Sequence, residues 1–117
     1  MKKIVITLAA VAVFLIAAVA NAGIQDFTIV NNTGNEIYYV YVSATISQDW
    51  EEDLLGNEIM YPNDQLQVSF VGGSNHCYWD LKIQDKDGRT QDWREIDLCT
   101  VGMVTLTYSN GFYNASW

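Results

Sequence analysis

"CYWDLKIQDKDGRTQDWREIDLC", residues 77–99, contains both cysteines of the chain and two of its four tryptophans. Near its middle, Asp87-Gly88 is a dipeptide that tolerates the positive φ angles of a two-residue type I′ turn. Residues on both sides of the dipeptide alternate between apolar and polar, as half-buried strands do. The stretch therefore predicts a β-hairpin in which Trp79 faces Ile96.

The same register places Cys77 opposite Leu98, so Cys99 falls one residue beyond the partner of Cys77. A bulge or a bend at the end of the strand brings the two sulfur atoms together. Two cysteines in an exported small domain normally pair. We therefore expect a Cys77–Cys99 disulfide. In the chain-entropy model, closing a loop of this length stabilises the folded state by about 3 to 4 kcal/mol.

The outer face of this hairpin is less regular in composition. The two-residue turn sets Asp80 opposite Glu95, and like charges across a sheet are unfavourable unless the register differs or a positive charge offsets them. It also places Trp93 on the outer face, and Tyr38 belongs to a strand with aromatic residues on both faces. Such residues form either a binding patch or a second packing layer. The candidate binding surface is Tyr38, Trp93, Asp80 and Glu95.

The remainder of the chain has the short period-two apolar runs of an all-β domain. A second tight turn, Asn110-Gly111, predicts a C-terminal hairpin that pairs Tyr108 with Tyr113 and Val104 with Trp117. We expect a small antiparallel β-sandwich or partly open barrel of about seven strands. The predicted strands are Gln25–Val30, Glu36–Ile46, Gln65–Val71, Cys77–Asp85, Thr90–Leu98, Met103–Tyr108 and Phe112–Trp117.

One segment departs from the strand pattern. In "SQDWEEDLLGN", Asp49 is an N-cap candidate, Glu52 follows it by three residues, and Gly56 is a C-terminal stop. This spacing predicts one or two helical turns that close one end of the domain. The acids Asp49, Glu51, Glu52 and Asp53 are alternatively a cation site.

The first 22 residues have the layout of a secretory signal peptide. Lys2 and Lys3 precede an uncharged apolar run, 4–19, and the small residues 20–22 follow it. The run is shorter than the ~20 residues that span a bilayer. We therefore expect cleavage after Ala22, a single β domain over 23–117 with no membrane span, and a location in the periplasm or the medium of a bacterium.

Composition narrows the partners of that domain. Without Lys2 and Lys3, four of the six basic residues remain against fourteen acids, so the net charge is −10. Nucleic acid and anionic membranes repel such a surface. The leading hypothesis is an interaction or envelope module whose partner is a protein or an envelope component. A second hypothesis is an inhibitor of a basic secreted enzyme such as lysozyme, since opposite charge accelerates association.

Residues for catalysis are sparse. His76 is the only histidine, and a Cys–His nucleophile needs a free thiol that export disfavours. No set of residues has the ligand spacing of zinc. Asp85 and Asp87 are candidate ligands for calcium, although this stretch lacks the ligand order of an EF-hand and a tight turn explains Asp87-Gly88 without a metal. We expect no enzyme activity and no obligatory cofactor.

Six short motifs in order resemble a family of small exported bacterial domains whose function is uncharacterised. They are "NNTG" at 31–34, "YVS" at 41–43, "WEEDLLG" at 50–56, "CYWDL" at 77–81, "DG" at 87–88 and "DLC" at 97–99. Some members of that family carry the label argininosuccinate lyase, which is incompatible with a domain of this size and export route. The resemblance implies an extracytoplasmic β domain with paired cysteines, and it implies no catalytic residue.

Overall fold

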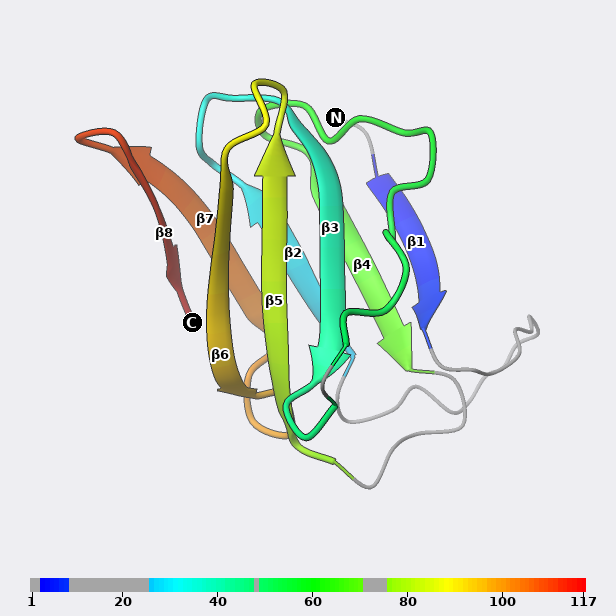
Figure 1. Ribbon diagram of the computed structural model, residues 1–117. Coiled ribbons are helices and arrows are strands. Elements are labelled where there is room, and N and C mark those ends of the chain that lie inside the picture. The colour runs from blue at the N-terminus through cyan, green and yellow to red at the C-terminus, as the bar shows by residue number, and fades with distance from the viewer. Residues whose placement is uncertain (1–2, 9–25, 48, 71–75) are drawn as a thin grey trace.

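The computed structural model describes residues 3–8, 26–47, 49–70 and 76–117. Within these residues, eight strands form two sheets, and the sheets face each other, as Figure 1 shows. The chain is thus an all-β sandwich, and no helix is present among the described residues. The strands are β1 (Lys3–Leu8), β2 (Phe27–Asn31), β3 (Ile37–Ala44), β4 (Gln65–Phe70), β5 (Tyr78–Asp85), β6 (Thr90–Asp97), β7 (Met103–Ser109) and β8 (Phe112–Ser116).

The larger sheet has the order β1-β4-β2-β7-β8 and the smaller sheet the order β3-β5-β6. Two pairs, β1–β4 and β2–β7, are parallel, and the other pairs are antiparallel. Strands β2 to β8 occupy the seven predicted positions, with ends that differ by one or two residues at most sites. β1 lies within the predicted signal peptide, whereas the predicted cleavage after Ala22 falls outside the described residues.

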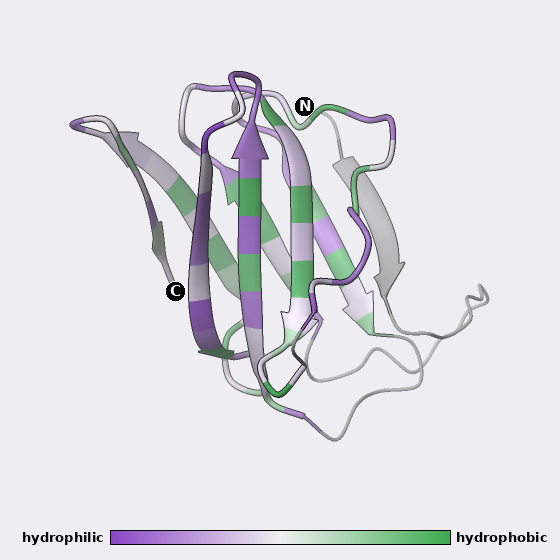
Figure 2. Ribbon diagram, in the orientation of Figure 1, coloured by the Kyte–Doolittle hydropathy of each residue, from purple (hydrophilic) through white to green (hydrophobic). Residues whose placement is uncertain are grey.

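Alternation along the strands builds the core between the two sheets. In β4, Leu66, Val68 and Phe70 are buried, as the alternation predicts. Figure 2 shows the same alternation along β5, where apolar and polar residues succeed each other. Trp79 packs its ring on Phe70 with 4.6 Å between ring centroids, which joins the two sheets. The core therefore draws on both layers, as in other sandwiches.

The segment from Asp49 to Gly56, where helical turns are expected, runs along the free edge of β3 with bends and a turn. Leu54 donates its N–H to the carbonyl of Val40 at 2.7 Å, and a bridge joins Ile37 to Met60. These bonds satisfy backbone groups that the edge of β3 would otherwise leave open. In the part of the chain that the structure describes, no helix is long and apolar enough to cross a bilayer.

Asn31, at the end of β2, organises the "NNTG" turn. Its side chain is fully buried and donates to the carbonyls of Asn35, Met60 and Tyr61, while its oxygen accepts the N–H and hydroxyl of Thr33. A buried amide with all of its groups paired rigidifies the chain around it. The β2–β3 connection and the segment before β4 are thereby fixed to one another.

The C-terminal hairpin follows the predicted register. Tyr108 pairs with Tyr113, and both loop residues, Asn110 and Gly111, have positive φ, as a type I′ turn requires. The ladder ends one pair short of the expectation, because Ser116 is the last paired residue of β8 and Trp117 is 54% exposed.

The β5–β6 hairpin departs from the predicted register at its turn. Asp85 donates its N–H to the carbonyl of Arg89, so the loop has three residues instead of two. Leu81 consequently pairs with Trp93 instead of facing Arg94. A shift between Trp79 and Leu81 then restores the expected pairing of Trp79 with Ile96. The register prediction was therefore wrong near the turn and is confirmed near the open end.

Candidate functional site

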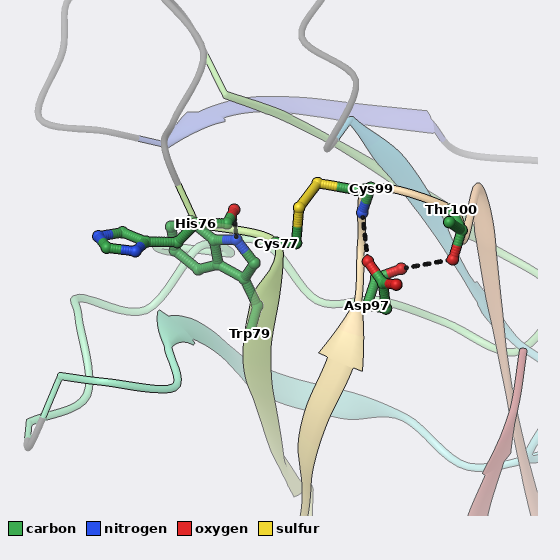
Figure 3. The surroundings of a disulfide bond; sticks show 6 residues. All are labelled: His76, Cys77, Trp79, Asp97, Cys99 and Thr100. Carbon is green, nitrogen blue, oxygen red and sulfur yellow. Dashed lines mark hydrogen bonds between the residues drawn. A yellow bond between two sulfur atoms is a disulfide. The ribbon is translucent and has the colours of Figure 1, made fainter.

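The predicted disulfide is present at the open end of the β5–β6 hairpin. Cys77 and Cys99 are bonded with their Cα atoms 5.1 Å apart, and Figure 3 shows the bridge beside Trp79. β6 ends at Asp97 and the chain then turns, with the Asp97 carboxylate accepting the N–H of Cys99 at 3.1 Å. This bend supplies the irregularity that the parity of Cys99 requires.

The disulfide removes two chemistries from this region. Neither cysteine is free, so no thiol can act as a nucleophile beside the exposed His76. One group of potential metal ligands is found among the described residues, Cys77, Asp97 and Cys99. Both of its sulfur atoms belong to the disulfide, whereas metals bind the thiolate form. The hairpin end is therefore a structural element.

Asp85, a calcium candidate, is buried at the other end of β5. Its carboxylate accepts the backbone N–H groups of Asp87 and Arg89, the Arg89 guanidinium at 2.8 Å and the Tyr113 hydroxyl at 2.7 Å. Burial opposes ionisation of Asp85, but the hydrogen bond from Tyr113 and the others outweigh burial and lower its pKa. The Arg89 guanidinium thus occupies the place that a cation would take between Asp85 and the exposed Asp87.

The acidic residues near residue 50 have different roles in the structure. Asp49 and Glu52 are exposed, whereas the carboxylate of Asp53 accepts the N–H groups of Val40 at 2.8 Å and Leu55 at 3.1 Å. Asp53 therefore caps open backbone donors of β3 and of its own segment. Among the described residues, these carboxylates do not come together in a group that could hold a metal ion. Calcium binding by this chain stays an untested alternative to the expectation of no cofactor.

The four residues of the predicted binding surface do not share one face. Trp93 pairs opposite Leu81 and packs against the core, because the three-residue turn shifts β6 by one position. Asp80 is buried, and its carboxylate accepts from Arg94 at 3.0 Å and from the N–H of Glu95 at 2.9 Å. Tyr38 is half-buried. The expected clash of Asp80 with Glu95 is thus resolved by both a bulge and a positive charge.

A different group of side chains gathers on the outer face of the β3–β5–β6 sheet. Tyr39 and Tyr41 stack with centroids 6.3 Å apart and planes 8° apart, and Trp50 lies 6.5 Å from Tyr41. Residues two apart on a strand share a face, so the tyrosine pair is a direct result of β3 being extended. Burial raises the pKa of Tyr41, and the nearby Asp53 adds to this effect.

Two cations complete this group. Lys82, opposite Tyr41 on β5, lies 5.8 Å from the Tyr41 centroid and 5.9 Å from the Trp50 centroid, and Arg94 lies 5.1 Å from the Trp50 centroid. These distances are within the range of cation–π attraction. We name the group the aromatic–cation cluster: Tyr39, Tyr41, Trp50, Lys82 and Arg94.

The cluster coincides with the only basic stretch of residues 23–117. All four Lys and Arg residues of that part lie in the β5–β6 hairpin, between residues 82 and 94. Carboxylates pair with Arg89 and Arg94, whereas the ammonium of Lys82 faces the two aromatic rings. Lys82 is therefore a partly exposed positive charge on an aromatic surface of an otherwise acidic domain. Sequence periodicity predicts the tyrosine pair, but the approach of Trp50 depends on the path of the segment beside β3.

Comparison with known proteins supports the fold. No family model matches the chain, and no curated protein matches it. The NMR structure of a protein from Eubacterium rectale is similar, with a TM-score of 0.55 and 14% identity over 78% of this chain and 84% of that one. At this identity, the similarity shows the fold alone.

Proposed function

We propose that this chain is an exported, non-enzymatic interaction module that binds a protein or envelope component through the aromatic–cation cluster. The disulfide supports an oxidising compartment, because such bonds persist outside the cytoplasm. The buried carboxylates among the described residues, Asp64, Asp80 and Asp85, serve the fold by accepting backbone and side-chain donors. We therefore assign the groups that remain at the surface to the recognition of a partner instead of to catalysis.

The observation that carries this proposal is the composition of the cluster. Tyrosine, tryptophan and arginine are the side chains that contribute most at protein interfaces, because they bury a large area at low conformational cost. Tyr39 is 38% exposed and Trp50 is half-buried, so both rings are accessible yet fixed by their neighbours. A fixed aromatic surface binds with little ordering entropy.

Site-specific photo-cross-linking tests this proposal. A photoreactive phenylalanine analogue is placed at Tyr39 and, in a control variant, at Phe112, which is 67% exposed on β8. Both variants are irradiated in the native envelope. We expect a saturable cross-link at position 39, lost when Trp50→Ala or Lys82→Glu is added, and none at position 112. Equal cross-linking at both positions, or none at 39, contradicts the proposal.

A second candidate function is inhibition of a basic secreted enzyme. Glu51, Glu52 and Glu58 are exposed on the segment that runs along β3, within a domain of net charge −10. An exposed acidic segment attracts a cationic enzyme at a distance and fixes its orientation on contact.

A lysozyme assay distinguishes this second function. If it holds, the domain slows cell-wall hydrolysis by a basic lysozyme at low salt, and the Glu51→Gln and Glu52→Gln double variant weakens inhibition at least tenfold. The Asp87→Asn variant removes an exposed acid from the β5–β6 turn and is the control. Inhibition that is absent, or equal in all three proteins, removes the candidate.

A further inference from the structure

β4 has a strand partner that the predicted processing of the chain removes. β1 pairs with β4 in parallel over six residues, from Lys3 opposite Gln65 to Leu8 opposite Phe70, with no shift of register (Figure 1). β1 lies at the end of the sheet, and β2 holds the other side of β4. Cleavage after Ala22 would therefore leave the outer edge of β4 open.

The described core and the disulfide lie in the part of the chain that cleavage would keep. All buried hydrophobic residues of the described core lie between Phe27 and Tyr113. The disulfide and the Asp85 network also lie in this range. A processed chain of residues 23–117 therefore retains the described core and its cross-link.

The edge of β4 lacks the features that normally protect a strand edge. Its sequence, "QLQVSF", has no charge, no proline and no glycine, and its pairing with β2 has no bulge. In the other sheet, the segment around Leu54 covers the edge of β3, and β6 carries Arg94 and a bulge at Glu95. A long, uncharged, regular edge accepts another strand readily.

The hydrogen bonds to β2 show which groups of β4 point outward. Asn31 donates to the carbonyl of Asp64, and Phe70 donates to the Asp26 carboxylate, so the even-numbered residues bond on the β2 side. Backbone groups alternate along a strand, so the N–H groups of Gln67 and Ser69 face the open side.

We propose that, after export, the β4 edge binds an extended segment of another protein by strand addition, in the position that β1 occupies here. This inference rests on the predicted cleavage and on none of the residues of the aromatic–cation cluster. The partner segment is expected to resemble β1, which pairs in parallel orientation and whose sequence, "KIVITL", has four β-branched residues and no acid. Two copies of a domain with net charge −10 repel each other, which favours a neutral or basic partner over a second copy.

Peptide binding to the exported protein tests this site. Protein purified after export is first weighed by mass spectrometry, and a mass that retains residues 1–22 would overturn the premise. A synthetic peptide of residues 2–8 is then titrated while backbone amide resonances are followed by NMR. We expect saturable binding with the largest shifts at Gln67 and Ser69. Shifts centred on the aromatic–cation cluster, or no binding, overturn the proposal.

Two backbone-modified peptides sharpen the result. One carries N-methyl groups at Ile4 and Ile6, and the other carries them at Val5 and Thr7. Only one of these two sets points its N–H groups at β4, because alternate residues of a strand bond to the same side. We expect one peptide to lose at least tenfold in affinity while the other binds like the unmodified peptide. Equal behaviour of the two contradicts strand addition.

Variants of the domain complete the test. Gln67→Pro removes an outward N–H without touching the ladder to β2, and Gln67→Thr retains that N–H as a matched control. We expect the proline variant to abolish peptide binding and the threonine variant to retain it. If the proline variant does not fold, the two methylated peptides still decide. If the domain forms dimers that Gln67→Pro disrupts, and does not bind the peptide, the assignment of another protein as the partner is contradicted.

Discussion

The two hairpins of this domain turn on similar dipeptides, yet only one follows the simple register. In β7–β8, Asn110 and Gly111 have φ values of 54° and 85°, and the strands pair as the alternation predicts. In β5–β6, Gly88 is the last residue of a three-residue loop and has a φ of 87°. A bulge at Glu95, with a φ of 61°, is needed further along to recover the pairing.

Buried carboxylates account for the difference. Asp85 sits at the turn and accepts two backbone N–H groups of the loop, which the three-residue form provides. Asp80 sits at the bulge, where Glu95 turns its N–H toward the carboxylate. The β7–β8 hairpin has no acidic residue in its strands. A turn dipeptide thus sets the register where no buried acid competes for backbone donors.

Of the changes that test this contrast, removal of the acid at the turn is expected to have the largest effect on stability. Asp85→Ala leaves the Tyr113 hydroxyl and two backbone N–H groups without their acceptor in a buried place. We expect a loss of about 4 kcal/mol in the free energy of unfolding. Urea denaturation measures it. Asp87→Ala, at a 69% exposed side chain, is the control and should cost under about 0.5 kcal/mol. Similar losses in the two variants would show that the carboxylate at 85 does not direct the turn.

The disulfide gives the irregular hairpin a constraint that the regular one does not need. Replacing Cys77 and Cys99 together by serine should lower the free energy of unfolding by about 3 kcal/mol, because the bond closes a 22-residue separation. Urea denaturation of the variant, with and without reductant, gives the value. The wild type in reductant should approach the variant. No difference between the variant and the oxidised wild type would mean that hydrogen bonds alone hold the open end.

The contrast between the two hairpins also shows how much of the fold the sequence predicts. Alternation and Asn110-Gly111 were sufficient for β7–β8, and cysteine pairing was sufficient for the open end of β5–β6. Acidic residues are normally assigned to the surface, so the burial of Asp80 and Asp85 could not be inferred from spacing.

The candidate site was harder to predict than the fold for the same reason. The one-residue shift at the turn moved Trp93 from the expected outer face to the core side. The outer aromatic group instead includes Trp50, which reaches Tyr41 only because its segment runs beside β3. Contacts between residues distant in sequence depend on tertiary packing, which local patterns do not encode.

The acid at the bulge is expected to matter less than the acid at the turn. Asp80→Ala removes the acceptor of the Glu95 N–H and of the Thr45 hydroxyl, but its ionic partner Arg94 remains 59% exposed to water. We expect a loss of about 2 kcal/mol by urea denaturation. Arg94→Ala should cost less than Asp80→Ala, since the pair is partly solvated. A larger loss for Arg94→Ala than for Asp80→Ala would mean that the charge, and not the backbone bond, maintains the bulge.

Tyr113 links the two hairpins, and alkaline titration should reveal the link. Burial, with the hydrogen bond to Asp85, raises the pKa of Tyr113 from 10.0 to about 12. The folded state therefore retains a proton that the unfolded state loses, so the contribution of Tyr113 to stability should be constant below pH 10 and fall between pH 10 and about 12. We expect Tyr113 to contribute about 1 to 2 kcal/mol of that fall.

Tyr41 also has a raised pKa, so the contribution of Tyr113 must be isolated by difference. The free energy of unfolding of the wild type and of Tyr113→Phe is measured by urea denaturation at each pH from 9 to 12. The phenylalanine variant should show a shallower decline in this window. Parallel curves for the two proteins would rule out a buried, hydrogen-bonded hydroxyl at this position.

The stability of the regular β7–β8 hairpin should depend mainly on its turn residue. Gly111 has a φ of 85° with open space around it, so Gly111→Ala meets no neighbour and only adopts an unfavourable backbone conformation. We expect a loss of about 1 kcal/mol, measured by thermal unfolding. Gly102 is equally uncrowded but has no positive φ, so Gly102→Ala should be neutral or slightly stabilising. Equal effects of the two substitutions would show that the positive φ at 111 is not what holds the β7–β8 register.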